Sequence, residues 1–339
     1  MTSPVTVVAS DISDRFSMYN GDCVEVIRGL PDNSAGYSIF SPPFEGLYVY
    51  SASPRDMGNS KSSAEFAEHM SFLAGELLRV TRPGRLLSMH CMLLPTSKAR
   101  DGFIGIRDFR GDLIRQYQAA GFIFHSEVVI WKCPVQAMQR SKSLGLLHKQ
   151  IRKDSCMSRQ GIPDYLVTFR KPGENPVPVS HEPDINEGDE PYPVKIWQRV
   201  ASPIWMSTSG TDDEGFAIPD GSDDKTDHGT IQPGDTLQRE SAREERDERH
   251  VCPLQLQVIR RAIRLWSKPE TKRKKDGKII PADVILSPFA GIGSEGYVAL
   301  QEGRRFVGIE LKESYYKQAV ANLRSVECGK GRQQSMFGD

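Results

Sequence analysis

Short apolar runs alternate with amphipathic segments through the first 131 residues of the chain. Such runs are typical of buried strands, whereas apolar residues spaced three or four apart indicate helices. The predicted strands are 16–20, 37–40, 85–90 and 122–131, and the predicted helices are 23–30, 64–81 and 108–120, the last of them ending before Gly121. Strands and helices that alternate at this spacing predict a parallel, doubly wound sheet of the Rossmann-like α/β class.

A second strand–helix–strand unit lies near the C-terminus, after an amphipathic helix predicted over 254–266. The predicted elements are a strand at 284–287, a glycine-rich turn, a helix over 296–302, a strand at 305–310 and a helix over 314–324. Too few residues follow this unit to complete a domain, so its strands must join those of the N-terminal part. The sequence therefore predicts one mostly parallel sheet with a circularly permuted strand order.

A basic segment, residues 138–171, separates the two parts, and only Asp154 and Asp164 oppose its positive charges. Residues 165–169 alternate like a strand, which we expect to pair antiparallel with 122–131 at the sheet edge while the basic segment loops out. The segment is either a nucleic-acid-binding surface or a solvated basic surface, and both interpretations stay open. Beyond it, proline and acidic residues dominate, and 207–235 is predicted to be disordered or a long loop.

Composition narrows the class of protein. The 339 residues are 38% hydrophobic and 26% charged with zero net charge, as in a globular protein whose uneven charge still permits DNA binding. No apolar run approaches the roughly 20 residues of a membrane span, and the first 15 residues lack a signal core, so we expect an intracellular protein without a membrane partner. The six cysteines contain no C-x-x-C pair, which argues against a zinc site, and we expect no metal.

The most informative residues are Ser41-Pro42-Pro43-Phe44, directly after the predicted strand 37–40. Neither proline has an N–H for a sheet ladder, so the strand must end in a rigid turn. The turn presents a hydroxyl, unpaired carbonyls and an aromatic ring at the carboxyl end of a strand, where open α/β sheets bind ligands. A flat ring with an amine could stack on Phe44 and donate to Ser41 Oγ and the Pro42 carbonyl. Taken alone, the tetrapeptide also fits a stiffened turn.

The segment from Gly291 to Gly296 matches the pattern G-x-G-x-x-G, and Glu310 ends the next predicted strand. Alone, this pattern predicts dinucleotide binding, with Glu310 on the ribose hydroxyls. Only 43 residues follow Gly296, however, and a permuted dehydrogenase would leave the Ser41 turn without a role. The nicotinamide interpretation is therefore the less favoured one.

Taken together, the two motifs resemble those of a known enzyme family. Ser41 to Phe44 resembles the (Asp/Asn/Ser)-Pro-Pro-(Tyr/Phe/Trp) motif of DNA methyltransferases that modify exocyclic amines, and Ser287 to Ser294 resembles their Phe-x-Gly-x-Gly cofactor motif. The order of catalytic motif, basic segment and cofactor motif is similar to the β group of N6-adenine and N4-cytosine DNA methyltransferases. The likeness covers 16–171 and 250–324, and it implies three parts: a catalytic half at 15–131, a target-recognition region at 132–249 and a cofactor half at 250–326.

The resemblance implies S-adenosylmethionine as the cofactor and double-stranded DNA as the partner. The implied catalytic residues are Ser41, Pro42, Pro43 and Phe44. The implied cofactor-binding residues are Asp22, Pro288, Phe289, Ala290, Gly291, Gly293, Ser294, Glu310, His250, Pro253 and Leu254. The DNA-binding residues expected in the basic segment are Arg140, Lys142, Lys149, Arg152, Lys153 and Arg159. Asp22 fits a helix N-cap equally well as a contact to the cofactor adenine.

Attack at cytosine carbon 5 would need a Pro-Cys pair, but the chain has only the reverse order at Cys133 and Cys252. Methylation of an exocyclic amine on a flipped base is therefore the favoured chemistry, with the loop 45–63 placed to close behind it. Serine at the first motif position favours cytosine N4, with adenine N6 and a DNA-binding protein without activity as alternatives. The oligomeric state, with a dimer as one option, and a partner nuclease stay open. We expect the protein in the cytoplasm of a prokaryotic cell, acting at the nucleoid, encoded by the cell or by a phage.

Overall fold

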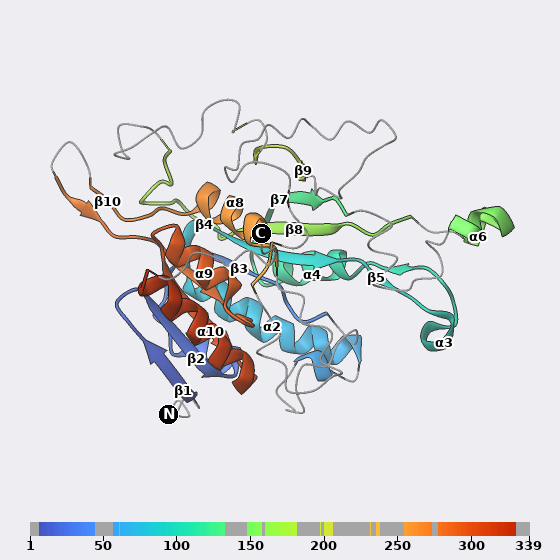
Figure 1. The fold of residues 1–339 in the computed structure, drawn as a ribbon, viewed down its shortest axis with the longest axis horizontal. Helices are drawn as coiled ribbons and strands as arrows, with labels where there is room; N and C mark the ends of the chain where they lie inside the picture. The colour runs from blue at the N-terminus through green and yellow to red at the C-terminus, as the bar shows by residue number, and fades with distance from the viewer. Residues whose placement is uncertain are drawn as a thin grey trace, which may run out of the picture.

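A nine-stranded sheet between two layers of helices forms the body of the protein in the computed structural model (Figure 1). The structure describes residues 7–44, 57–60, 62–132, 148–157, 160–181, 197, 200–205, 231, 235–237, 254–272 and 277–329. In sheet order the strands are β1 (Val7–Ile12), β2 (Phe16–Gly21), β13 (Arg305–Glu310), β12 (Val284–Ser287), β3 (Ala35–Phe40), β4 (Thr81–Met92), β8 (Asp164–Arg170), β7 (Ile123–Ile130) and β9 (Ile204–Trp205).

The two ends of the chain meet in the middle of this sheet. Strands β2, β13, β12, β3 and β4 run parallel, so the two C-terminal strands lie between two N-terminal ones. This confirms the predicted doubly wound, mostly parallel sheet and its permuted strand order. It also places the ends of β3 and β12 next to each other, although about 250 residues separate them in the chain.

Helices cover both faces because the central strands carry apolar side chains on both sides, as parallel strands do. All six residues of β3 are buried. One apolar cluster joins the sheet to α8 (Leu256–Trp266), α9 (Ser294–Gln301) and α10 (Glu313–Glu327). A second cluster joins the other face to α1 (Cys23–Arg28), α2 (Ser63–Val80) and α4 (Phe109–Ala119). The predicted helices are thus present, and they sort into two layers (Figure 1).

Local signals set the ends of several helices. Ser62 caps α2 by accepting from the N–H of Glu65, and Asp108 caps α4 by accepting from the N–H of Gly111. Gly121 follows α4 with φ of 107°, a left-handed conformation that glycine adopts without steric cost, as predicted.

The predicted antiparallel pair is present as β7 and β8, but it does not form the edge of the sheet. Strand β8 lies between β4 and β7, and the two-residue strand β9 pairs parallel with β7 on its outer side. A two-residue strand is too short to show periodicity. At the other edge, β1 pairs antiparallel with β2 and was not predicted, because its side chains are largely exposed.

Several predictions fall on residues outside the described ranges. These are most of the loop 45–63 and all of 207–235 except Ile231 and Asp235. The three-part division of the chain stays a prediction. Among the helices that the structure describes, none is long and apolar enough to cross a membrane. Within the same residues, no group of three or more His, Cys, Asp or Glu side chains is arranged to hold a metal ion.

Candidate active site

The two motifs follow neighbouring parallel strands, so both lie where the carboxyl ends of these strands leave the sheet. Strand β12 pairs with β3 in the register Ile285 to Tyr37 and Leu286 to Ser38, so the turns after Ser287 and Phe40 emerge side by side. The rings of Phe40 and Phe289 lie 5.9 Å apart between their centroids. The fold therefore brings two turns next to each other: the proline turn, residues 41–44, and the glycine turn, residues 288–293.

Side chains from other elements pack against the proline turn. Pro42 and Pro43 are buried, whereas Ser41 and Phe44 are half-buried. The Phe44 ring meets the ring of Phe109 edge-on, with centroids 6.1 Å apart, and its centroid lies 6.5 Å from that of His90. These contacts fix the aromatic ring on one side of the turn and leave the serine hydroxyl at its start.

A chain of polar groups extends from Ser41 into the sheet. Ser41 Oγ forms a hydrogen bond of 3.0 Å with Nδ1 of His90, which lies in β4. On the other side of the ring, Nε2 lies 3.0 Å from Oδ2 of Asp164, an electrostatic contact whose angle falls short of a hydrogen bond. The Lys132 ammonium is 2.5 Å from the same carboxylate oxygen. Serine, imidazole, carboxylate and ammonium are thus lined up.

The charge state of this chain follows from its surroundings. Burial raises the pKa of Asp164, but the positive Lys132 and the neighbouring His90 outweigh burial and lower it to about 2. Asp164 is therefore a buried anion at neutral pH, directed at an imidazole that itself contacts Ser41.

Sequence analysis missed His90, Asp164 and Lys132. The available signal was weak: a single histidine at the end of a predicted buried strand, and an acid directly before the predicted strand 165–169. Their meeting depends on the antiparallel register of β4 and β8, which opposes His90 to Leu166 and Met92 to Asp164. Register between strands more than 70 residues apart is not visible in local sequence.

The glycine turn is shaped by its backbone. Gly291 and Gly293 have φ of 53° and 85°, in the left-handed region that side chains disfavour. A Cβ added at Gly293 would lie 3.1 Å from Cβ of Ala319 on α10, whereas one added at Gly291 would meet nothing within 4 Å. Gly293 is therefore needed for helix packing. Gly291 borders open space in which a ligand can approach the backbone.

Glu310 ties this turn to the end of β13. Its carboxylate accepts from the N–H of Gly291 at 2.8 Å and from the N–H of Lys312 at 2.9 Å. Asn20, opposite Glu310 in β2, donates to the Glu310 and Leu311 carbonyls. Asp22 is the first residue after β2, and it caps α1 by accepting from the N–H groups of Val24 and Glu25. The helix-cap interpretation of Asp22 is thus confirmed, and its contact with a cofactor stays a prediction.

Buried polar atoms without partners line the same turn. Ser287 Oγ and Ser294 Oγ have no hydrogen-bond partner within the part of the chain that the structure describes. Burial raises the pKa of Glu295 to about 8, and the Glu310 carboxylate adds to the shift. Unpaired buried hydroxyls cost free energy, so such groups beside an open backbone fit a bound polar ligand.

The remaining predicted residues are less informative. Pro288 and Ala290 are buried in the turn, and Leu254 is buried in the apolar cluster that also contains Ala290. The basic residues Lys149, Arg152 and Lys153 lie exposed on the short helix α6 (His148–Lys153). The predicted residues outside the described ranges are His250, Pro253, Arg140, Lys142 and Arg159.

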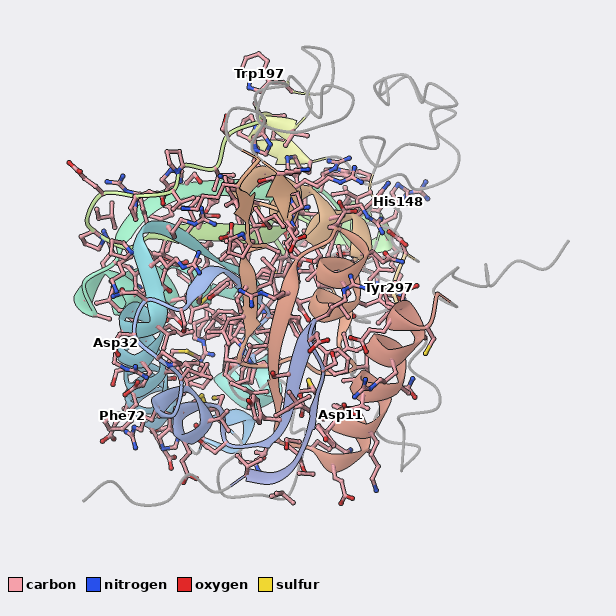
Figure 2. All side chains as sticks on the ribbon, turned by 90° about the vertical axis from the view of Figure 1, so that its left-hand side faces the viewer. Asp11, Asp32, Phe72, His148, Trp197 and Tyr297 are labelled. Atoms are coloured by element: carbon pink, nitrogen blue, oxygen red, sulfur yellow. The ribbon has the colours of Figure 1, made fainter. Side chains whose placement is uncertain are left out.

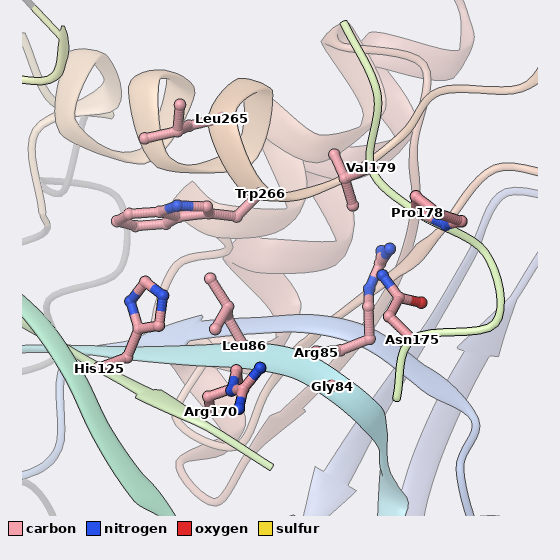
Figure 3. A pocket seen from close by; sticks show the side chains of 10 residues that line it. All are labelled: Gly84, Arg85, Leu86, His125, Arg170, Asn175, Pro178, Val179, Leu265 and Trp266. Carbon is pink, nitrogen blue, oxygen red and sulfur yellow. The ribbon is translucent and has the colours of Figure 1, made fainter. Parts of the chain in front are cut away.

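A pocket of about 340 Å³ lies between α8 and the sheet, away from Ser41. Figure 3 shows Trp266 and Leu265 on the helix side and His125, Leu86 and Arg170 on the strand side. Leu86 is opposite Tyr37 in β3, whereas the proline turn follows Phe40, which is opposite Met89. The pocket thus lies nearer the amino ends of the parallel strands, and no residue of the two motifs lines it.

Comparisons with known proteins agree with this arrangement. Two curated proteins of Escherichia coli (strain K12) share short segments: YubD, whose name describes it as a methylase, is 47% identical over 47 residues, and the DNA adenine methyltransferase YhdJ is 44% identical over 43 residues. These segments span 14% and 13% of this chain, and only 21% and 15% of the lengths of those proteins.

Solved structures share the fold over nearly the whole chain. TTHA0409 from Thermus thermophilus, a DNA modification methylase by name, solved with S-adenosyl-L-methionine, matches with a TM-score of 0.60 and 19% identity, covering 92% of this chain and 94% of that one. The cytosine-N4-specific PvuII DNA methyltransferase matches with a TM-score of 0.52 and 15% identity, covering 94% of both chains. The family model described as DNA methylase, for N6 and N4 methyltransferases, matches residues 38–321 and so includes both motifs. The chain therefore belongs to this DNA methylase family.

Proposed function

We propose that this protein transfers a methyl group from S-adenosylmethionine to an exocyclic amine of a DNA base that is extruded from the duplex, and that the acceptor is N4 of cytosine. The observation that carries the proposal is the meeting of the Ser41 turn and the Phe289 turn at one edge of the sheet, after the adjacent strands β3 and β12. One turn offers acceptors and an aromatic face to a base. The other offers an open backbone to a cofactor.

The proline turn would hold and activate the base. The amine lone pair of cytosine or adenine is delocalised into the ring, so the amine is a poor nucleophile. Ser41 Oγ and the Pro42 carbonyl accept its two hydrogens, Phe44 stacks on the ring, and the lone pair is directed out of the ring plane. Holding both reactants in line supplies the remaining rate enhancement.

His90 and Asp164 give the released proton a path. With Nε2 protonated and facing the Asp164 carboxylate, Nδ1 of His90 accepts the hydrogen of Ser41 Oγ, whose free lone pairs then face the amine. As the amine forms its bond to carbon it becomes positive and gives a proton to Ser41, which passes its own to His90. The buried Asp164 anion stabilises the imidazolium.

The glycine turn fits the cofactor. S-adenosylmethionine supplies an electrophilic methyl group when it is bound. Phe289, Ala290, Gly291 and Gly293 would surround its methionine part, since the open space at Gly291 lets the backbone come close. Glu310 would accept from the ribose hydroxyls, and Asp22 would contact the adenine. Pro288 and Ser294 would complete the cofactor-binding turn. Leu254, together with His250 and Pro253, would border the methionine tail.

The choice of base rests on one side chain. Serine at position 41 favours cytosine N4, whereas the short segment shared with a DNA adenine methyltransferase favours adenine N6. The exposed cations of α6, and those expected at Arg140, Lys142 and Arg159, would bind DNA phosphates, so affinity falls steeply with salt. A dimer, a partner nuclease and action at the nucleoid of a prokaryotic cell stay predictions.

The test identifies the product directly. The protein is incubated with unmodified DNA and methyl-labelled S-adenosylmethionine, the DNA is digested to nucleosides, and the labelled base is identified by mass spectrometry. N4-methylcytosine is the expected product. N6-methyladenine would contradict cytosine as the acceptor base but support methylation of an exocyclic amine. The product 5-methylcytosine, or no product, would contradict the proposed reaction.

A further inference from the structure

Two segments project from the sheet beside the catalytic turn. Strand β4 continues past His90 into a hairpin made of β5 (Leu94–Pro95), α3 (Lys98–Asp101) and β6 (Ile106–Arg107). Strand β8 begins at Asp164, after α6 and the 3-10 helix η3 (Ser155–Met157). Figure 1 shows α3 and α6 extending from the same side of the molecule. Because Met92 is opposite Asp164, both projections leave the sheet within a few residues of the chain of groups that contacts Ser41.

The hairpin is held by hydrogen bonds between its arms and exposes a phenylalanine ring near its tip. Its base is fixed by the buried Leu94, and the N–H of Thr96 donates to the Gly105 carbonyl at 3.1 Å across the two arms. Asp101 closes the tip by accepting from the N–H of Ser97 at 2.7 Å. Phe103, directly after this turn, is nevertheless 58% exposed. Its ring lies near Gly105 of the opposite arm, and more than half of its surface stays open to a partner.

The second projection has the charge that DNA attracts. No residue of α6 or η3 is buried, and Lys149, Arg152 and Lys153 are exposed there beside the single acid Asp154. Exposed cations beside a catalytic site provide contacts to phosphates, which position a duplex without reading its sequence. Both projections, on neighbouring strands, thus expose cations and apolar side chains, Lys98 and Phe103 on the hairpin and the cations of α6 with Ile151 and Met157 on the other. Among the exposed large apolar side chains that the structure describes on the two projections, Phe103 is the aromatic one.

Extrusion of a base leaves a gap in the stack, and proteins that distort DNA insert apolar side chains between bases. We propose that a DNA duplex binds against both projections and that Phe103 is the wedge that enters the base stack beside the extruded base. This inference rests on the proposed function, because it assigns a residue to the extrusion step of that reaction. Phe103 is a positioning residue: it keeps the base out of the helix and does not touch the reacting atoms.

The chain offers a matched control in Phe72. This residue is 51% exposed, but it lies on the outer surface of α2, as Figure 2 shows, and not on either projection. Removing either ring deletes a similar exposed apolar surface. Only removal at Phe103 should affect the extrusion of a base.

The experiment compares Phe103→Ala, Phe103→Trp and Phe72→Ala with the natural protein. The methylated sequence is first mapped on plasmid DNA, and two oligonucleotide duplexes are then made, with the target base paired normally or placed opposite an abasic site. We expect Phe103→Ala to methylate the paired duplex about 10- to 100-fold more slowly and the abasic duplex within about threefold of the natural rate, since an unpaired base needs less help to leave the stack. Phe103→Trp should keep most activity on both duplexes.

Different results would contradict the role of Phe103 as a wedge and the proposed function. Equal rates for Phe103→Ala and Phe72→Ala on the paired duplex would overturn the wedge alone. An equal loss on both duplexes would also overturn it, because it would indicate a contact that only adds affinity. Absence of a methylated base with the natural protein would overturn the proposed function, and this inference with it. Unchanged thermal unfolding of both alanine variants checks that the fold is intact.

Discussion

The two turns that meet at the candidate active site are built in opposite ways. The glycine turn depends on missing side chains: its conformation and its open space come from Gly291 and Gly293, and Ala319 of α10 packs closely against Gly293. The proline turn depends on side chains that arrive from elsewhere, since Ser41 contacts His90 of β4, which in turn faces Asp164 of β8. A turn of the first kind can be recognised from a short motif. For a turn of the second kind, the motif reveals the residues of the turn but not the side chains that contact it.

The largest expected effect on the reaction comes from Ser41→Ala, which removes an acceptor for the amine hydrogens and the first group of the proton path. We expect the rate of methyl transfer to fall by about 1000-fold, with the affinities for DNA and cofactor within a few-fold of the natural values. Single-turnover kinetics and equilibrium binding measure these quantities separately. Lost DNA binding with an unchanged rate would contradict the role of Ser41, and a natural protein with no turnover would be a DNA-binding protein without activity.

Asp164→Asn tests whether the carboxylate at the start of β8 contributes to methyl transfer through His90 and Ser41. The variant keeps the shape of the side chain and removes the charge that stabilises a protonated His90, so the maximal rate should fall by about 100-fold while KM for DNA changes little. Asp112→Asn, which removes an exposed carboxylate on α4, is the control. A change confined to KM, or a rate equal to that of the control, would show that Asp164 only supports the fold.

Gly293→Ala tests the glycine turn, where we expect a loss of stability as well as of cofactor affinity. The left-handed φ and the 3.1 Å approach to Ala319 should cost about 2 kcal/mol or more of unfolding free energy. Gly329→Ala is the control, because Gly329 has a φ of 69° but nothing within 4 Å of an added Cβ. Urea denaturation measures the difference, and calorimetry measures cofactor binding. Equal destabilisation of both variants would show that contact with α10 does not matter.

The smallest effect on the reaction is expected from Glu295→Gln, which should change how stability depends on pH. The pKa of Glu295 is raised to about 8 in the folded protein, so the folded state holds a proton that the unfolded state releases above its ordinary pKa of 4.5. The unfolding free energy of the natural protein should therefore fall between about pH 4.5 and pH 8, by up to about 5 kcal/mol, and level off above that range.

Glutamine mimics the protonated carboxyl, so Glu295→Gln should be more stable than the natural protein at pH 8 and equal to it near pH 4. Urea denaturation of the cofactor-free protein across this range measures the difference. Glu313→Gln, which removes an exposed carboxylate paired with Lys317, should give no such gain. A difference between Glu295→Gln and the natural protein that does not grow with pH would mean that Glu295 is ionised in the folded state.

Much of the scaffold could be predicted because its signals are local. The apolar runs at 37–40 and 284–287 became β3 and β12, and helix-spaced residues became α2 and α10. Hydrophobic periodicity repeats within a few residues and needs no partner to be visible. The permuted order of the sheet was predicted from the order of the two motifs along the chain, and the strand order confirms it.

The two edge strands, β1 and β9, were not predicted because they lack such local signals. Strand β9 is two residues long, and β1 exposes most of its side chains, so neither carries a periodic pattern. Trp205 shows what decided the position of β9: its side chain is buried, and the Arg261 guanidinium lies 5.3 Å from the centre of its ring. That contact comes from a helix about 50 residues away.

By itself, the sequence determined the two turns, because proline and glycine act on the backbone at the positions where they stand. Only the tertiary structure decided what surrounds them: that Phe40 packs near Phe289, that Ser41 contacts His90, and that His90 faces Asp164. The hairpin that carries Phe103 leaves the sheet after the same strand as His90. The physical reason is the distance along the chain over which each effect acts. Backbone restriction acts within a residue or two, whereas these meetings depend on strand order and register, which the burial of the whole sheet selects.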